Sequence, residues 1–187
     1  MAYQIDKEQG RIYPAKWVKS PNFDARPEGV EPNLIVVHGI SLPPNQFGGD
    51  GVEQLFTNRL DPNAHPYYRE IAHLKVSSHL FIRRDGEVVQ FVAFHQRAWH
   101  AGVSRWLGRE RCNDFSIGIE LEGADHLPYR AEQYGMLAEV IQALQQVYPI
   151  EQNAVVGHCD IAPERKTDPG EMFNWEALKR LMQRKAV

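Results

Sequence analysis

The segment LIVVHG, residues 34–39, carries the strongest indication of the fold. Its first four residues form a continuous apolar run, mostly β-branched, which is typical of a strand covered on both faces by other parts of the protein. The run ends at a histidine and a glycine, and residues 41–51, with two prolines and several glycines, follow as a loop. A buried strand that opens into such a loop is a frequent location for a functional site.

The rest of the chain predicts more strands and a few helices around this one. Asp85-Gly86 lies between two apolar runs, which is a strong signal for a β-hairpin. Apolar residues at helical spacing predict a long helix over residues 131–148, which Pro149 ends. The expected strands are residues 34–37, 79–82, 87–94, 116–121 and 154–156, and the other expected helices are residues 52–60 and 175–184.

These elements predict a single domain, residues 1–187, of the mixed α/β or α+β class, with a central mixed β-sheet and packed helices. Residues 1–32, rich in proline and charge, are expected to form an irregular N-terminal arm over the fold.

Composition narrows the range of partners. The net charge is −3 and no block of like charges occurs, so neither nucleic acid nor an anionic membrane surface is expected as a partner. No apolar run approaches the ~20 residues of a membrane span, and the first residues lack the apolar core of a signal peptide. Two cysteines are too few for a disulfide framework. A cytoplasmic location is therefore expected.

Two histidines indicate a metal site. His38 and His158 each follow an apolar strand beside a glycine, and neutral imidazole is the commonest metal ligand. A catalytic zinc has three protein ligands, and the third here is either Asp160 or Asp168. Cys159 would point away from His158 if strand geometry continued, so a buried free thiol is expected instead. Spacing alone leaves open that these histidines are ordinary hydrogen-bonded residues.

Glu120 is a candidate general base. Strand alternation places it opposite Ile117, Ile119 and Leu121, and desolvation in an apolar strand would raise the pKa of its carboxyl group. An exposed glutamate on an edge strand is the alternative. Glu122 shares its face, but parallel carboxylates on one strand would not flank a glycosidic bond.

Two further features allow both a functional and an ordinary interpretation. Lys166 would stabilise an oxyanion, or would be one member of the solvated run at residues 164–166. Trp99 and Arg111 belong to an aromatic and basic segment that would line a groove for a sugar or an anionic peptide, or would be a loop around a core tryptophan.

Three longer stretches carry a family resemblance. RAWHAG (97–102), RERCNDFSIGIELEG (109–123) and GHCDIAPERKTDPG (157–170) resemble the N-acetylmuramoyl-L-alanine amidases of the peptidoglycan-recognition-like fold. The similarity extends from about Pro14 to Trp175 and includes ISLPPNQFGG (40–49) and residues 64–90. The resemblance is strongest to the cytoplasmic branch of the family, which acts on 1,6-anhydro-N-acetylmuramyl peptides in peptidoglycan recycling.

The resemblance implies a role for each candidate in the metal site. Zn²⁺ would be held by His38, His158 and Asp168, which selects the third ligand. Glu120 would act as base and proton carrier, and Lys166 would support the tetrahedral intermediate. Related phage and animal amidases usually carry cysteine at the third ligand, so the aspartate favours the cytoplasmic branch.

By the same analogy, three residues would bind substrate. Arg111 and Lys75 would meet carboxylates of the stem peptide, and Trp99 would lie near the sugar. Gly39 departs from the family pattern, in which a polar residue often follows the first ligand, so a substrate contact is expected to be lost there.

The activity expected from this resemblance is zinc-dependent hydrolysis of the amide bond between the lactyl group of 1,6-anhydro-N-acetylmuramic acid and L-alanine, by a monomer acting on an anhydro-muropeptide. Two alternatives belong to other classes. One is a non-catalytic muropeptide-binding module, since zinc-free relatives of this fold are receptors. The other is a zinc peptidase that cuts within the stem peptide.

Overall fold

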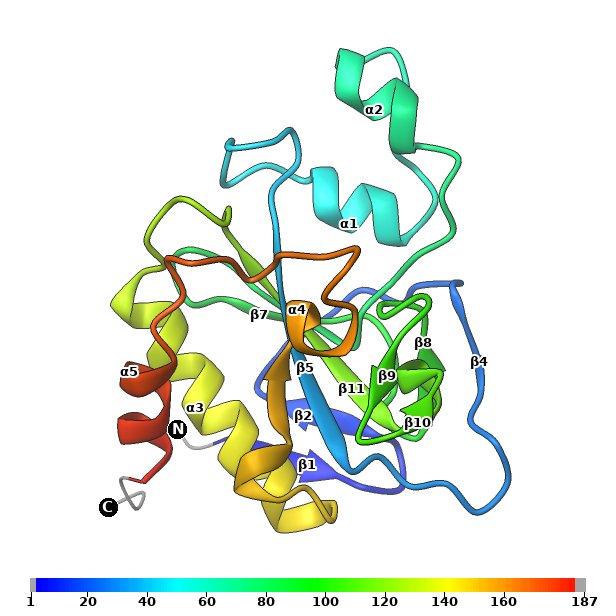
Figure 1. Cartoon of the computed structure of the whole chain (residues 1–187). Helices are drawn as coiled ribbons and strands as arrows, with labels where there is room; N and C mark the ends of the chain where they lie inside the picture. Colours follow the sequence, from blue (N-terminus) through cyan, green and yellow to red (C-terminus); the bar gives the residue numbers. More distant parts are fainter. Residues whose placement is uncertain (1–2, 184–187) are drawn as a thin grey trace.

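A computed structural model describes residues 3–183 and contains a mixed six-stranded sheet at its centre (Figure 1). The strands follow the order β12-β5-β11-β6-β7-β3. The first four are parallel to one another, β7 is antiparallel to β6, and β3 is parallel to β7. Their bounds are β3 Lys16–Trp17, β5 Leu34–Ile40, β6 Leu80–Ile82, β7 Val88–Gln90, β11 Ser116–Glu122 and β12 Val155–Gly157. The expected central mixed sheet is therefore present.

One face of the sheet is covered by two helices, α3 (Ala131–Val147) and α5 (Trp175–Met182). Leu137, Ile141 and Leu144 of α3 are fully buried, and they belong to one apolar cluster with Ile117 and Ile119 of β11. This confirms the helix predicted over residues 131–148 and the orientation predicted for the isoleucines of β11.

The other face carries two smaller apolar clusters. One joins Phe81 and Val89 to helix α1 (Gly51–Phe56), and the second joins Leu34 and Val36 to residues such as Ala101 and Phe115. The run at residues 34–37 is thus buried on both faces, as predicted. Further elements are α2 (Pro66–Ile71), β8 (Gln96–Ala98), β9 (Arg105–Trp106), β10 (Arg109–Glu110) and the 3-10 turns Cys112–Asp114 and Gln152–Ala154.

The prediction of an irregular N-terminal arm is wrong. Residues 3–32 contain β1 (Gln4–Asp6) and β2 (Arg11–Tyr13), which pair antiparallel, and β4 (Phe23–Ala25), which pairs with β8. The strand β3 extends the central sheet. These strands are two or three residues long, and they form because a distant strand or hairpin partner is available, which local composition does not reveal.

Several other boundaries differ from expectation. The hairpin β6–β7 is present, with Gly86 at φ +89° in its turn, but β7 ends at Gln90 rather than residue 94. The helix predicted at residues 52–60 ends at Phe56. The helix predicted at residues 175–184 ends at Met182, and residue 184 lies outside the described residues. No helix within residues 3–183 is long and apolar enough to cross a membrane.

Candidate active site

The candidate site lies beyond the carboxyl ends of neighbouring parallel strands. His38 is near the end of β5, and His158 directly follows β12, which pairs with β5. Strand geometry does not continue through His158, because residues His158–Ile161 form a single helical turn, α4. Asp160 accepts a hydrogen bond from the backbone N–H of Gly157 at 2.7 Å, which caps that turn. Asp160 therefore has a structural role, and among the described residues it is not part of the group that could hold a metal ion.

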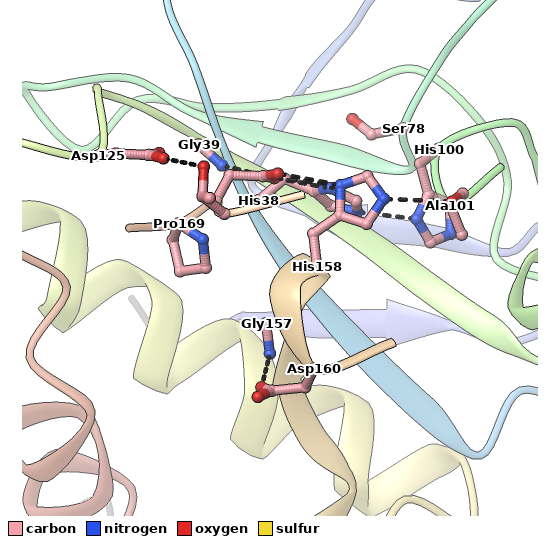
Figure 2. A network of polar contacts seen from close by, with 12 residues as sticks. His38, Gly39, Ser78, His100, Ala101, Asp125, Gly157, His158, Asp160 and Pro169 are labelled. Atoms are coloured by element: carbon pink, nitrogen blue, oxygen red, sulfur yellow. Dashed lines mark hydrogen bonds and ion pairs between the residues drawn. The ribbon is translucent and has the colours of Figure 1, made fainter. Parts of the chain in front are cut away.

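The remaining candidate for the third ligand is Asp168. Its backbone carbonyl accepts the N–H of Cys159 at 3.0 Å, which holds the loop against α4. Its carboxylate oxygens lie 3.2 Å from Nδ1 of His38 and 3.2 Å from Nδ1 of His158. One ligand atom from each of the three residues can be chosen so that all lie within 4.8 Å of one another. Figure 2 shows the two imidazoles turned toward this common point.

The far nitrogen of each imidazole is also engaged. Nε2 of His158 donates to the carbonyl oxygen of Ala101 at 3.1 Å, and Nε2 of His38 lies 2.9 Å from Nδ1 of His100 (Figure 2). A proton on each Nε2 leaves each Nδ1 as a lone pair directed at the common point.

Burial lowers the pKa of His38 to about 4, so this imidazole is neutral at pH 7. The two histidines hold the pKa of the Asp168 carboxyl well below its usual range, against the opposing effect of burial. Two imidazoles and one carboxylate are a donor set that suits a divalent transition metal and is known for catalytic zinc. The residues present therefore fit the metal that the resemblance implies.

Glu120 is adjacent to this group. It pairs with His38 in the parallel register of β11 and β5, on the face opposite Ile119, and it is buried. Because β11 lies between β5 and β6, the alternative of an exposed edge-strand glutamate is wrong. Burial, with a smaller contribution from the negative charge of Asp168, raises the pKa of the Glu120 carboxyl well above its usual range. Among the described residues, Oε2 of Glu120 has no hydrogen-bond partner.

Lys166 lies close enough to act on both groups electrostatically. Its positive charge lowers the pKa of Glu120 and of His38. Its side chain is half-buried, and its backbone N–H donates to the carbonyl of Ala162 at the end of the α4 segment. Its charge therefore acts on both groups, and its catalytic role stays a prediction.

Of the three residues predicted to bind substrate, the structure brings only two close to each other. The indole N–H of Trp99 donates to Asp24 at 3.1 Å, and the positive charge of Arg111 acts on the same carboxylate. Trp99 and Arg111 therefore belong to one polar cluster. Lys75 is exposed on the segment between α2 and β6. The assignment of all three to substrate binding stays a prediction.

The structure also shows the surroundings of Glu122 and Cys159, the two other residues considered for the site. Glu122 accepts the backbone N–H groups of Gly48 and Arg84, so it ties the 41–51 loop to the β6–β7 turn. Cys159 is half-buried and free, and burial raises the pKa of its thiol. It is not among the metal-site residues found within residues 3–183.

The sequence did not predict the position of two residues near the possible metal-binding group. His100 contacts His38, as described above. Tyr129 donates to the carbonyl of Pro169 at 2.9 Å, next to Asp168, and its hydroxyl fills the space above Gly39. A Cβ at Gly39 would lie 2.2 Å from that hydroxyl, which explains the glycine after the first ligand. A glycine directly after a buried strand residue was the available signal for such a close approach.

The fold and this site define a known class of protein. Residues 28–171 match the family described as N-acetylmuramoyl-L-alanine amidase. The chain belongs to this family.

The individual relatives are more specific. The chain is 57% identical to the 1,6-anhydro-N-acetylmuramyl-L-alanine amidase AmpD of Escherichia coli (strain K12), over 96% of this chain and 98% of the relative. Identity to the protein of the same name from Haemophilus influenzae is 49%, over 91% of this chain and 94% of the relative.

Solved structures of amidases are similar to this chain as well. A crystal structure of a selenomethionine derivative of AmpD superposes with a TM-score of 0.92 at 58% identity, covering 95% of this chain and 98% of that one. The amidase AmiD from E. coli, in complex with the substrate anhydro-N-acetylmuramic acid-L-Ala-D-gamma-Glu-L-Lys, gives a TM-score of 0.61 at 26% identity, covering 95% of this chain and 65% of that one.

Proposed function

We propose that this protein is a zinc-dependent amidase that hydrolyses the bond between the lactyl group of 1,6-anhydro-N-acetylmuramic acid and L-alanine in muropeptides. The observation that carries the proposal is the buried carboxylate of Glu120 beside a ready donor set of His38, His158 and Asp168. The names of the relatives, and the muropeptide bound to AmiD, support the same substrate class. A non-catalytic binding module would need neither the base nor the donor set.

The proposed chemistry assigns one task to each group. When bound by His38, His158 and Asp168, zinc supplies a Lewis acid for the lactyl carbonyl and lowers the pKa of a bound water toward ~7. Glu120 accepts a proton from the attacking water and passes it to the nitrogen of the leaving L-alanine. A carboxyl group whose pKa is raised suits both halves of this transfer, because it holds the proton until the C–N bond breaks.

Lys166 has the complementary electrostatic task. Attack on the lactyl carbonyl places negative charge on its oxygen, and a fixed cation nearby stabilises that charge most in a site from which water is excluded. The effect of Lys166 on the pKa of Glu120 and His38 supports this role, because its charge acts on the proposed base and the proposed metal ligand. When the C–N bond breaks, the proton held by Glu120 leaves on the amine product. The oxygen whose charge Lys166 balanced becomes part of the carboxylate product.

The stem peptide would extend toward Arg111. This arginine lines a cavity of about 1100 Å³ between the β9–β10 hairpin and residues 160–165. A guanidinium group binds a carboxylate with two parallel hydrogen bonds, so Arg111 suits the acidic groups of a stem peptide. Trp99, near the same cluster, would contact the sugar ring, and Lys75 would meet a more distant carboxylate.

The decisive experiment incubates the purified protein with an anhydro-muropeptide, with and without a chelator, and identifies the products by mass spectrometry. The proposal expects intact stem peptide and free anhydro-N-acetylmuramic acid, and no product after chelation. Fragments of the stem peptide would indicate a zinc peptidase instead. An unchanged substrate together with stoichiometric binding would indicate a receptor.

A cytoplasmic location and a monomeric state complete the proposal. The aspartate at the third ligand supports the location, since it is typical of the cytoplasmic branch of the family. Cell fractionation tests the location, and light scattering of the zinc-loaded protein tests the monomer.

A further inference from the structure

The hydrogen bond from His38 ends on another histidine rather than on a carbonyl or a carboxylate. Nε2 of His38 lies 2.9 Å from Nδ1 of His100, and Nε2 of His100 lies 3.1 Å from Oγ of Ser116. The rings of His38 and His100 are nearly perpendicular, at 88°. These contacts form a chain of three side chains that begins at the proposed metal site and ends on β11.

The direction of this chain follows from the donor set. Nδ1 of His38 faces Asp168 and His158, so a neutral His38 that ligates through Nδ1 carries its proton on Nε2 and donates it to His100. Nδ1 of His100 is then an acceptor, and its proton resides on Nε2, where it is donated to Ser116. Only one arrangement of tautomers satisfies both hydrogen bonds while leaving His38 free to bind a metal.

The backbone of β11 is shaped to receive the His100 ring. A Cβ added at Gly118 would lie 2.4 Å from the ring of His100, so a glycine is required for the ring to reach this position. The loop that carries the ring is held in turn, because the backbone N–H groups of His100 and Ala101 both donate to Oδ1 of Asn113, at 3.1 Å and 2.8 Å. One strand therefore supplies the space at Gly118 and the acceptor at Ser116.

We propose that His100 is a positioning residue that fixes the tautomer and the ring orientation of His38, and thereby sets the metal affinity of the site. The inference rests on the proposed zinc site. The second imidazole, that of His158, has a different kind of partner. It is oriented by the backbone carbonyl of Ala101, which substitution of a side chain does not remove. Partners of this kind typically contribute about 10–100-fold to metal affinity.

The test compares two substitutions at His100 in the full-length protein. His100→Leu removes the acceptor, whereas His100→Asn retains an oxygen near the position of Nδ1. Zinc affinity is measured by competition with a chromophoric chelator, and thermal unfolding of the metal-free protein reports on packing. The exposed His73→Leu serves as the matched control. We expect a loss of affinity of about 10–100-fold in His100→Leu, a loss several times smaller in His100→Asn, and none in the control.

The outcomes separate this inference from the proposed function. A wild-type protein without stoichiometric zinc would overturn both. Wild-type affinity in His100→Leu, or equal losses in both His100 variants, would overturn the positioning role alone, because packing rather than the acceptor would then matter. If His100→Leu does not fold, Gly118→Ala displaces the ring without removing it. Weaker zinc binding is expected in that variant as well, and unchanged binding would contradict the inference.

Discussion

Glu120 lies directly beside His38 in the parallel pairing of β11 with β5. Paired strands are about 4.8 Å apart, so the register brings the proposed base and the first metal-site histidine to the same face of the sheet. A slip of one residue would direct Glu120 into the apolar cluster under α3. The pairing of two buried strands therefore determines where Glu120 lies relative to His38, independently of the loops.

Replacing the base should separate metal binding from turnover. Glu120→Gln is expected to keep zinc at wild-type stoichiometry and to lower kcat by about 10²–10⁴-fold, because no group remains to accept the proton of water. The variant should unfold at the same or a higher temperature, since a buried carboxyl group with a raised pKa destabilises the folded state at pH 7. The measurements are metal analysis, steady-state kinetics and thermal unfolding.

The exposed Glu139→Gln is the control for this prediction and should resemble the wild type in all three measurements. Turnover of Glu120→Gln within a few-fold of the wild type would remove Glu120 from the mechanism.

Removing the cation should alter both the rate and its pH dependence. Lys166→Met is expected to lower kcat on the order of 10²-fold by loss of oxyanion stabilisation. The positive charge of Lys166 lowers the pKa of Glu120, so its loss raises that pKa. The base must be deprotonated to act, and the acid limb of kcat/KM should therefore move to higher pH. A pH–rate profile is compared with that of the exposed Lys179→Met, and an acid limb that stays in place would argue against this electrostatic effect of Lys166 on Glu120.

Gly39 and Tyr129 should show strong coupling. Gly39→Ala places a Cβ 2.2 Å from the Tyr129 hydroxyl, whereas the next ring atom is 3.5 Å away. The single variant is therefore expected to displace Tyr129 from Pro169 and to weaken both the fold and zinc binding. In the Tyr129→Phe background, which itself loses one hydrogen bond worth about 1 kcal/mol, the same alanine should cost little more.

A double-mutant cycle on the free energy of unfolding measures this coupling. Additive effects of the two substitutions would show that the hydroxyl is not what requires glycine at residue 39.

Stability should fall in mild acid because of a buried histidine away from the metal ligands. Burial, reinforced by the charge of Arg26, lowers the pKa of His79 to about 3, below its unfolded value of about 6.5. The unfolded chain therefore binds the proton first, and the contribution of neutral His79 is present above pH 6.5 and lost as the pH falls toward 3.

The measurement is denaturant unfolding of the metal-free protein between these pH values. His79→Gln should reduce the slope of unfolding free energy against pH by up to about 1.4 kcal/mol per pH unit, while the exposed His73→Gln should not. An identical slope in both variants would contradict the assignment.

Periodic features of the sequence predicted the strands and faces that build the site. The apolar run at residues 34–37 indicated a buried strand, and alternation along 116–121 placed Glu120 on the correct face. These predictions succeed because strand periodicity is local and each face of the sheet imposes its own composition.

Contacts between distant segments were beyond such reasoning. Spacing left Asp160 and Asp168 as alternatives, and only the helical turn α4 shows that Asp160 caps Gly157. The partnership of His38 with His100 joins residues 62 positions apart, and no periodicity reports it. The short strands β3 and β4 likewise depend on partners elsewhere in the chain.

We propose that one zinc ion held by His38, His158 and Asp168 is required for amide hydrolysis. Titration of zinc into the metal-free protein, with release of stem peptide from an anhydro-muropeptide as the readout, tests it most directly. We expect no turnover without metal, a linear rise in turnover as zinc is added, and a plateau at one equivalent of zinc. Asp168→Ala should show none of this recovery. Full turnover by the metal-free protein would contradict it.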